Sequence, residues 1–380
     1  MHIITLKERF VAYKVLDLAP GDYVVEDHNG AQLMSYAGQG RMRPLDNDRK
    51  FDEKQDWNGK SIVIVRAGGY GDITLGITPL ARELKRRWPT CKVAVCTMKA
   101  YAVVLKNLPF VDEVCGYPAP VDDFMKYDGW IFLEGAVEHN PDARKLHMAD
   151  LFAKIAGLKD KPGLAANGGH PALDDQSAAY VCTEGEMNWL VEMYPRNTRR
   201  RVTMQVGASA ACRVYPGNKW QEVIKSMLDR GWEVFLLGKR GEIRGDQPVD
   251  HLYNLTDQDT SFRHSCAVIN SSDVFIGNDS ALLHVAGALG IPAVGLYGPF
   301  LGSLRTSYAK NTFAIQATGP CAPCFHHANP GRGGGNGFPE NCPSKDKGVC
   351  QVLESIPPER VVGKAEQIAK KAPLALVATD

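Results

Sequence analysis

The sequence has almost no net charge and no long hydrophobic run. Its 44 Lys and Arg residues are balanced by 43 Asp and Glu residues, so the composition does not indicate a dedicated nucleic-acid binder. The most apolar stretch, residues 281–297, is interrupted by His284 and Pro292 and is shorter than the ~20 residues that span a bilayer. The start, MHIITLKERFVAYK, lacks the apolar segment and cleavage site of a standard signal peptide. We therefore expect a cytoplasmic protein without a transmembrane segment.

Two common nucleotide-binding patterns are also missing. The glycine-rich turn at residues 66–72, RAGGYGD, fits neither G-x-G-x-x-G nor G-x-x-x-x-G-K-[ST]. The strand expected after it ends in CTM, residues 96–98, rather than in the acidic residue that holds the ribose of NAD. Both features argue against a dehydrogenase.

The 380 residues favour two domains, each built from alternating strands and helices. Short apolar runs rich in β-branched residues predict parallel strands at 61–65, 92–96, 111–114 and 130–133, and again at 202–206, 232–238, 274–277 and 293–298. We expect a β-rich extension at 1–60, a Rossmann-like acceptor domain at 61–195, a Rossmann-like nucleotide-sugar domain at 196–355, and a last helical segment at 356–380. Parallel sheets bind ligands beyond the carboxyl ends of their strands, so function is sought in the loops that follow strands.

The first such loop is the turn at residues 66–72. Its glycines let the backbone come close to a ligand, and Asp72 lies near the start of a helix expected at 73–88. The alternative is that Asp72 is only a helix N-cap.

The second loop, residues 205–220, combines small residues with Arg213 and Lys219. The positive charges of these two side chains suit a phosphate group. The alternative is that both are surface cations beside Trp220, which would pack in the core.

The third loop begins the segment GNDSALLHVAGALGIP, residues 277–292. Its Asn, Asp and Ser supply helix-capping chemistry, and a helix N-terminus is an anion site. Asp279 is a suitable acceptor for sugar hydroxyls, and His284 lies on roughly the same helix face as Ser280. The alternative is that His284 is a core residue with a local partner.

Together these loops resemble the ADP-heptose:lipopolysaccharide heptosyltransferases, glycosyltransferase family 9. The resemblance covers residues 61 to about 365 and is carried by VRAGGYGDITLGITPLARELKRRWP, GNKWQEVIKSMLDRGWEVFLLG and GNDSALLHVAGALGIPAVGLYGP. It implies the GT-B fold, which has two facing Rossmann-like domains, with the last helix packed back on the first domain. It also implies an inverting transfer of heptose from ADP-heptose without a catalytic metal.

The resemblance assigns roles to single residues. Asp72 matches the aspartate regarded as the general base, and Lys219 matches a lysine that contacts the donor's phosphates. Ala281 stands where the family usually has glycine. The catalytic candidates are thus Asp72 and Lys219, and the donor-binding candidates are Gly71, Ser209, Arg213, Glu242, Asp279, Ser280, Ala281 and His284.

Several alternatives stay open at this point. The acceptor is a lipopolysaccharide core, a protein side chain or an unusual target such as a modified nucleobase, and the extension at 1–60 argues against plain lipopolysaccharide. The donor could instead be a UDP- or GDP-sugar, or the chain could bind a sugar nucleotide without catalysis. A homo-oligomer is a further expectation.

Four of the ten cysteines are clustered: Cys321, Cys324, Cys342 and Cys350. Four thiolates could hold structural zinc or iron, with His326 and His327 as spare candidates. The region resembles the four-cysteine iron finger of the family branch that glycosylates autotransporter proteins. The alternative is reduced, unliganded cysteines or disulfides.

Overall fold

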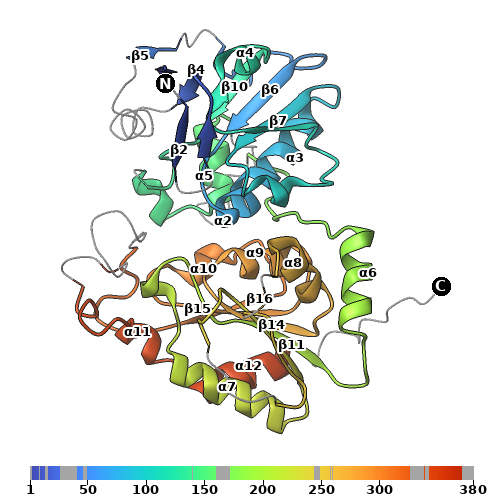
Figure 1. Cartoon of the computed structure of the whole chain (residues 1–380). Helices are drawn as coiled ribbons and strands as arrows, with labels where there is room; N and C mark the ends of the chain where they lie inside the picture. Colours follow the sequence, from blue (N-terminus) through green and yellow to red (C-terminus); the bar gives the residue numbers. More distant parts are fainter. Residues whose placement is uncertain are drawn as a thin grey trace. The chain divides into compact units, whose positions relative to one another are not determined.

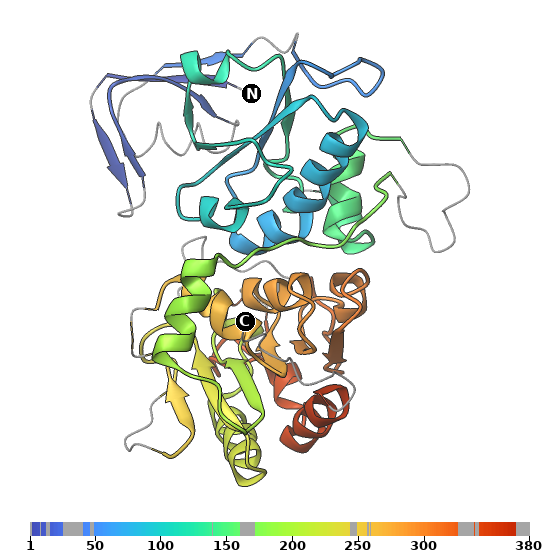
Figure 2. The same ribbon diagram turned by 90° about the vertical axis from the view of Figure 1, so that its right-hand side faces the viewer.

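The computed structural model describes residues 2–7, 9–12, 16–25, 41–45, 49–138, 140–159, 172–243, 249–256, 258, 260–325, 338 and 342–369. The chain divides into two compact units, Met1–Ser177 and Ala178–Asp380. Figures 1 and 2 show that each unit combines a sheet with helices, and each is described separately below.

Unit 1 is built on a parallel sheet of four strands in the order β10-β6-β7-β8. These strands are β6 (Ser61–Val65), β7 (Lys92–Thr97), β8 (Glu113–Gly116) and β10 (Gly129–Phe132). The helical segments are α2 (Tyr70–Asp72), η1 (Ile73–Ile77), α3 (Thr78–Arg87), η2 (Ala102–Leu105), α4 (Val121–Phe124), η3 (Pro141–Arg144) and α5 (Met148–Ile155). The apolar runs of β6 and β7 are almost entirely buried, which confirms the predicted α/β pattern.

A small β-rich extension precedes this sheet, as predicted. It contains β1 (His2–Leu6), β2 (Phe10–Ala12), β3 (Leu16–Leu18), β4 (Gly21–Val25) and β5 (Arg41–Pro44). β1 pairs with β4 and β5, and β4 pairs with the short strand β9 (Ala119–Pro120) from the later part of unit 1. The chain then crosses to β10, where the amide of Phe51 donates to the carbonyl of Trp130 at 3.0 Å. The extension is therefore joined to the unit by backbone pairing. Residues 26–40 of the expected extension lie outside the described residues.

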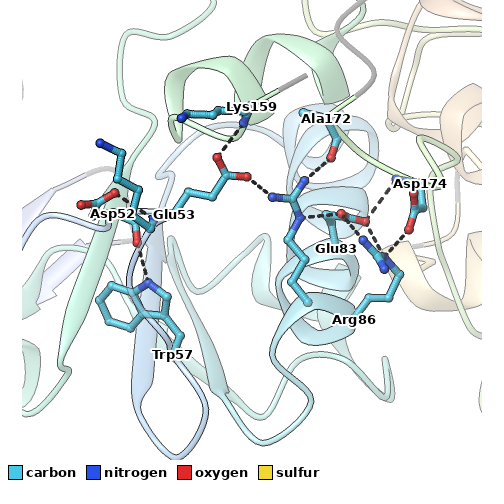
Figure 3. A network of polar contacts seen from close by, with 10 residues as sticks. Asp52, Glu53, Trp57, Glu83, Arg86, Lys159, Ala172 and Asp174 are labelled. Atoms are coloured by element: carbon cyan, nitrogen blue, oxygen red, sulfur yellow. Dashed lines mark hydrogen bonds and ion pairs between the residues drawn. The ribbon is translucent and has the colours of Figure 1, made fainter. Parts of the chain in front are cut away.

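A polar network ties the end of the extension to α3 (Figure 3). Glu83, only 2% exposed, accepts hydrogen bonds from Arg86 and Arg87 and from the amide of Asp174. Arg87 also pairs with Glu53. Burial by itself would raise the pKa of Glu83, but the two arginines and the Asp174 amide lower it to about 2. These arginines of the basic run 85–87 are thus held by carboxylates of the chain itself.

We expect Glu83→Gln to lower the free energy of unfolding at pH 7 by about 2 kcal/mol, because Arg86 and Arg87 lose a buried counter-ion. The folded pKa of Glu83 lies below its ordinary 4.5, so its contribution is complete above pH 4.5 and is lost as the pH falls toward 2. Urea unfolding should therefore show that the free energies of unfolding of the two proteins differ less at pH 3 than at pH 7. Glu192→Gln, at an exposed position of another helix, is the control. A difference of equal size at both pH values would contradict this account.

Unit 2 is built on a parallel sheet of six strands in the order β13-β12-β11-β14-β15-β16. The strands are β11 (Arg201–Gln205), β12 (Glu233–Leu237), β13 (Leu252–Asn254), β14 (Val274–Asn278), β15 (Ala293–Tyr297) and β16 (Thr312–Gln316). The helices are α6 (Glu184–Met193), η4 (Ala211–Arg213), α7 (Gly217–Asp229), α8 (Phe262–Asn270), α9 (Ala281–Ala288), α10 (Gly302–Arg305), α11 (Gln351–Glu354) and α12 (Pro358–Ala369). The two edge strands, β13 and β16, were not predicted, because they are only partly buried and lack a continuous apolar run.

The last described helix, α12, belongs to the core of unit 2. Val361, Val362, Ala365 and Ala369 are buried there in the same apolar cluster as Trp220 and Val223 of α7. The family resemblance places the last helix on the N-terminal domain instead. The difference arises because the apolar face of α12 is already covered by other residues of unit 2. Residues 370–380 lie outside the described part.

Among the described residues, no helix has both the length and the apolar character that a membrane crossing requires.

Candidate active-site residues

Asp72 lies in a turn that is organised around a buried arginine. The chain leaves β6 at Val65, and Arg66, which is 1% exposed, points its guanidinium at the carboxylate of Asp72 in α2. Arg66 Nε donates to Asp72 Oδ2 at 3.1 Å, and Arg66 Nη2 donates to the same oxygen. A Cβ atom at Gly68 would lie 2.5 Å from Asp72 Oδ2 and 2.6 Å from Arg66 Nε. A side chain at position 68 would therefore push against this ion pair.

The other carboxylate oxygen of Asp72 is open. Among the described residues no hydrogen bond reaches Asp72 Oδ1, and the side chain is 23% exposed. The N-cap of α2 is Gly69, and the Asp72 side chain caps no backbone amide of the described helices. Asp72 occupies the N-cap position of η1, but its side chain makes no capping hydrogen bond there. Gly71 lies in the same helical turn, directly before Asp72.

Two acidic residues beside Asp72 were not predicted. Glu138 accepts hydrogen bonds from Arg66 Nη2 at 2.8 Å and from Nη1 at 3.2 Å, and Glu134 accepts one from the amide of Ala67. Burial by itself would lower the pKa of Arg66, but the charges of Asp72 and Glu138 outweigh it and raise the pKa. Both glutamates come from the loop after β10, far along the sequence. No local motif could have shown that they meet Asp72.

In unit 2, Asn278 joins the second and third candidate loops. Its side-chain oxygen accepts from the amide of Tyr215 at 3.0 Å, and its Nδ2 donates to the carbonyls of Val206 and Gly207 at 3.1 and 3.2 Å. Asn278 is fully buried at the end of β14. It holds the loop after β11 against the loop after β14, a role that its capping chemistry did not predict.

The hydroxyl of Ser280 does not cap α9. It occupies the N-cap position, but its hydroxyl donates to the side-chain oxygen of Gln205. Arg213 donates to the Asp279 carbonyl at 3.0 Å and to the Ser209 hydroxyl at 2.6 Å. The predicted residues Ser209, Arg213, Asp279 and Ser280 are thus brought together at the carboxyl ends of β11 and β14.

Asp279 is a buried carboxylate surrounded by positive groups. Its Oδ1 lies 3.5 Å from Nε2 of His284, and its side chain is 6% exposed. Burial would raise the pKa of Asp279, but His284, Arg305 and Arg213 lower it to about 2. The carboxylate is therefore ionised at neutral pH and lies beside His284, which is itself mostly buried. His284 thus has the local partner that the core alternative supposes. Burial leaves only a small part of the Asp279 side chain open to the sugar hydroxyl expected from the sequence.

Arg305 was not predicted as part of this cluster. It ends α10, and its guanidinium lies 5.1 Å from the ring centre of Phe300. Within the described part of the chain it makes no hydrogen bond or ion pair, although its charge acts on Asp279. A short helix with one terminal arginine carries no recognisable motif, which is why the sequence did not reveal it.

The remaining candidates in unit 2 occupy different places. Glu242 lies over the loop after β11, because a Cβ atom at Gly207 would overlap its carboxylate, and its Oε2 accepts from the amide of Lys239 at 2.8 Å. Ala281 is the first residue of α9. Lys219 lies in the first turn of α7 and donates to the carbonyl of Ile356 at 3.3 Å. Trp220 is 1% exposed, so its expected core position is confirmed.

The cysteine cluster has a buried fifth neighbour, Cys212. Burial raises the pKa of the Cys212 thiol to about 11, and the charges of Cys324, Cys342 and Cys350 add to this rise. Cys321 and Cys324 are exposed. Among the described residues, however, no three His, Cys, Asp or Glu side chains are close enough to hold a metal ion. His326 and His327 lie outside the described residues.

The sequence profile of glycosyltransferase family 9 (heptosyltransferase) matches residues 141–332, half of the chain. The chain belongs to glycosyltransferase family 9. Lipopolysaccharide heptosyltransferase 2 of Escherichia coli K12 is 25% identical over 130 residues, which are 31% of this chain and 36% of that protein. The alignment thus spans about a third of the curated relative's length.

Solved structures of the family share the fold. ADP-heptose LPS heptosyltransferase II of E. coli is similar with a TM-score of 0.60 and 18% identity, over 82% of this chain and 99% of that one. The dodecameric iron-containing heptosyltransferase TibC, in complex with ADP-D-beta-D-heptose, is similar with a TM-score of 0.58 and 16% identity, over 97% of this chain and 91% of that one. The predicted GT-B fold of two Rossmann-like domains is confirmed.

Proposed function

We propose that this family 9 protein transfers a heptose, or a closely similar sugar, from ADP-heptose to an acceptor hydroxyl with inversion at the anomeric carbon. The proposal rests above all on Asp72. One of its carboxylate oxygens is fixed by Arg66, and the other, which accepts no hydrogen bond from the described residues, can accept a proton. A general base must offer such an oxygen within ~3 Å of the hydroxyl that it deprotonates.

In the proposed step the acceptor oxygen forms a bond to the anomeric carbon of the sugar. Its proton passes to Asp72 Oδ1, and the bond between the anomeric carbon and the diphosphate oxygen breaks. The electron pair of that bond leaves with ADP. The reaction requires Asp72 and the donor to come within reach of one another during turnover.

The donor is assigned to unit 2, at the carboxyl ends of its strands. Arg213 supplies positive charge for the diphosphate, Arg305 adds a further guanidinium, and His284 is a proposed donor contact beside Asp279. Backbone amides at the start of α9, from Ser280 and Ala281, add the partial charge of a helix N-terminus. Lys219 and Glu242 remain proposed contacts to the phosphates and the ribose. No step of this mechanism requires a metal ion.

The assay that tests this function is ADP release from ADP-heptose in the presence of three acceptors: heptose-deficient lipopolysaccharide, a polypeptide and an oligonucleotide. UDP- and GDP-sugars serve as alternative donors. Release that depends on ADP-heptose and on one acceptor supports the proposal. Release only from a UDP- or GDP-sugar would replace the donor, and binding without release under every condition would identify a non-catalytic binding protein.

We further propose a structural zinc or iron ion at Cys321, Cys324, Cys342 and Cys350. The proposal is supported by the mutual electrostatic effects of these cysteines and by the similarity of the chain to TibC, an iron-containing heptosyltransferase. Metal analysis of the purified protein should give about one ion per chain. Cys324→Ser should reduce this content, whereas Cys91→Ser, at a buried cysteine of unit 1, should not. Only trace metal in the unaltered protein would refute the site.

A homo-oligomer also stays a proposal, supported by the similarity of the chain to TibC, which is dodecameric. Light scattering of the purified chain tests it, since a monomer mass would exclude an oligomer under those conditions.

A further inference from the structure

The guanidinium of Arg66 is shared between two carboxylates. Its Nη2 donates both to Oδ2 of Asp72 and to Oε1 of Glu138, and its Nη1 donates to Oε2 of Glu138 and to the carbonyl of Leu133 at 3.0 Å. Arg66 is 1% exposed, whereas the side chains of Asp72 and Glu138 are 23% and 35% exposed. The positive charge is therefore buried, and both negative charges lie where solvent and ligand can reach them.

In general, sharing one guanidinium between two carboxylates changes how strongly each carboxylate holds a proton. A carboxylate that is the only counter-ion of a buried guanidinium is strongly stabilised in its charged form and is a weak base. A second carboxylate on the same guanidinium removes part of that stabilisation. It also leaves Arg66 with a counter-ion at the moment when Asp72 becomes neutral, so no buried charge is left unpaired during proton transfer.

We propose that Glu138 is a positioning residue that keeps Asp72 basic by sharing Arg66 with it. This inference rests on the proposed function of Asp72 as general base. In the transfer step the acceptor proton binds to Asp72 Oδ1, and Arg66 keeps its two hydrogen bonds to Glu138. Glu138 itself neither gains nor loses a proton.

Two further titratable groups described near Asp72 are Glu134 and Tyr101. Glu134 accepts a hydrogen bond from the amide of Ala67, and its negative charge also acts on Arg66. Tyr101, from the segment after β7, is packed edge-on against Tyr70 with ring centres 4.8 Å apart. Burial and the charge of Asp72 both raise the pKa of Tyr101, so it stays neutral in the range in which Asp72 acts. Glu138, with its two hydrogen bonds from Arg66, competes directly with Asp72 for the buried guanidinium.

The test is Glu138→Gln, which keeps a hydrogen-bond acceptor for Arg66 but removes the charge. We expect the maximal transfer rate to fall about 5-fold and the acid limb of the pH–rate profile to move down by roughly 0.5 to 1 pH unit. Glu138→Asp should restore the acid limb of the unaltered protein. Glu366→Gln is the matched control, since Glu366 is also a partly exposed carboxylate beside an arginine, Arg230, but in unit 2.

Two outcomes would overturn the inference. A lower rate with an unmoved acid limb would mean that Glu138 acts on structure alone. A loss of rate as large as that of Asp72→Asn would mean that Glu138 is the base.

A second measurement does not depend on turnover. Protein labelled with carbon-13 at the aspartate carboxyl groups gives an NMR titration curve for Asp72, assigned by its disappearance in Asp72→Asn. Glu138→Gln should lower the midpoint of that curve by the same 0.5 to 1 pH unit, roughly. An unchanged midpoint would refute the inference even if the protein is active. If the midpoint moves but the protein releases no ADP from any donor, only the proposed function is refuted.

Discussion

Asp72→Asn is expected to lower the transfer rate by about 10³-fold, because an amide cannot accept the acceptor's proton. The asparagine oxygen can still accept the hydrogen bonds of Arg66, so the turn after β6 should keep its shape and the protein its stability. Donor binding should also persist, since the donor contacts are assigned to unit 2. Steady-state rates of ADP release at saturating donor, together with thermal unfolding, check all three statements.

Asp123→Asn is the matched control for this prediction. Asp123 is an exposed aspartate of α4 in the same unit, and its replacement should leave the rate unchanged. Near-normal turnover by Asp72→Asn would remove Asp72 from the role of base.

Asp279→Asn is expected to produce the second large effect, on donor affinity and on stability together. The Asp279 carboxylate orients His284 and balances the charges of Arg305 and Arg213, so its loss should weaken donor binding about 30-fold. The pKa of Asp279 is lowered from its ordinary 3.8 to about 2, so the charge stabilises the fold above pH 3.8 and this contribution is lost as the pH falls toward 2. The variant should therefore unfold at a lower temperature at pH 7, with a smaller difference at pH 3.

Asp229→Asn provides the comparison, because Asp229 forms an exposed ion pair with Lys225 on α7 and such pairs contribute little to stability. Calorimetric titration with ADP and thermal unfolding at both pH values measure the two effects. Unchanged ADP affinity in Asp279→Asn would exclude this carboxylate from the donor site.

Local sequence patterns were sufficient to predict the alternation of strands and helices, and they singled out the turn that holds Asp72. The runs SIVIV and KVAVC form adjacent buried strands, because β-branched residues fit a sheet covered on both faces. The glycine-rich turn also shows its purpose in the structure, since Gly68 leaves room for the Arg66–Asp72 pair. The strands depend on residues that are close in sequence, which is why they could be predicted, whereas the Arg66–Asp72 pair was not.

Long-range partners could not be predicted in the same way. Glu138 reaches Arg66 from 72 positions away, and Asn278 holds the backbone of Val206 from 72 positions away. A helix-capping motif looks the same whether its serine caps the helix or bonds to a distant glutamine, as Ser280 does with Gln205. Side-chain polarity predicts that a partner exists, but only the fold determines which one.

The central claim is that donor binding and proton removal reside in separate groups, the first around the start of α9 and the second at Asp72. Titration of the unaltered protein and of Asp72→Asn with ADP-heptose, followed by measurement of ADP release from both with acceptor present, tests it most directly. The account predicts that the two proteins bind ADP-heptose with dissociation constants within about two-fold of each other. Only the unaltered protein should transfer the sugar, because Asp72→Asn lacks the proton acceptor. Failure of either protein to bind ADP-heptose, or equal transfer by both, would contradict it.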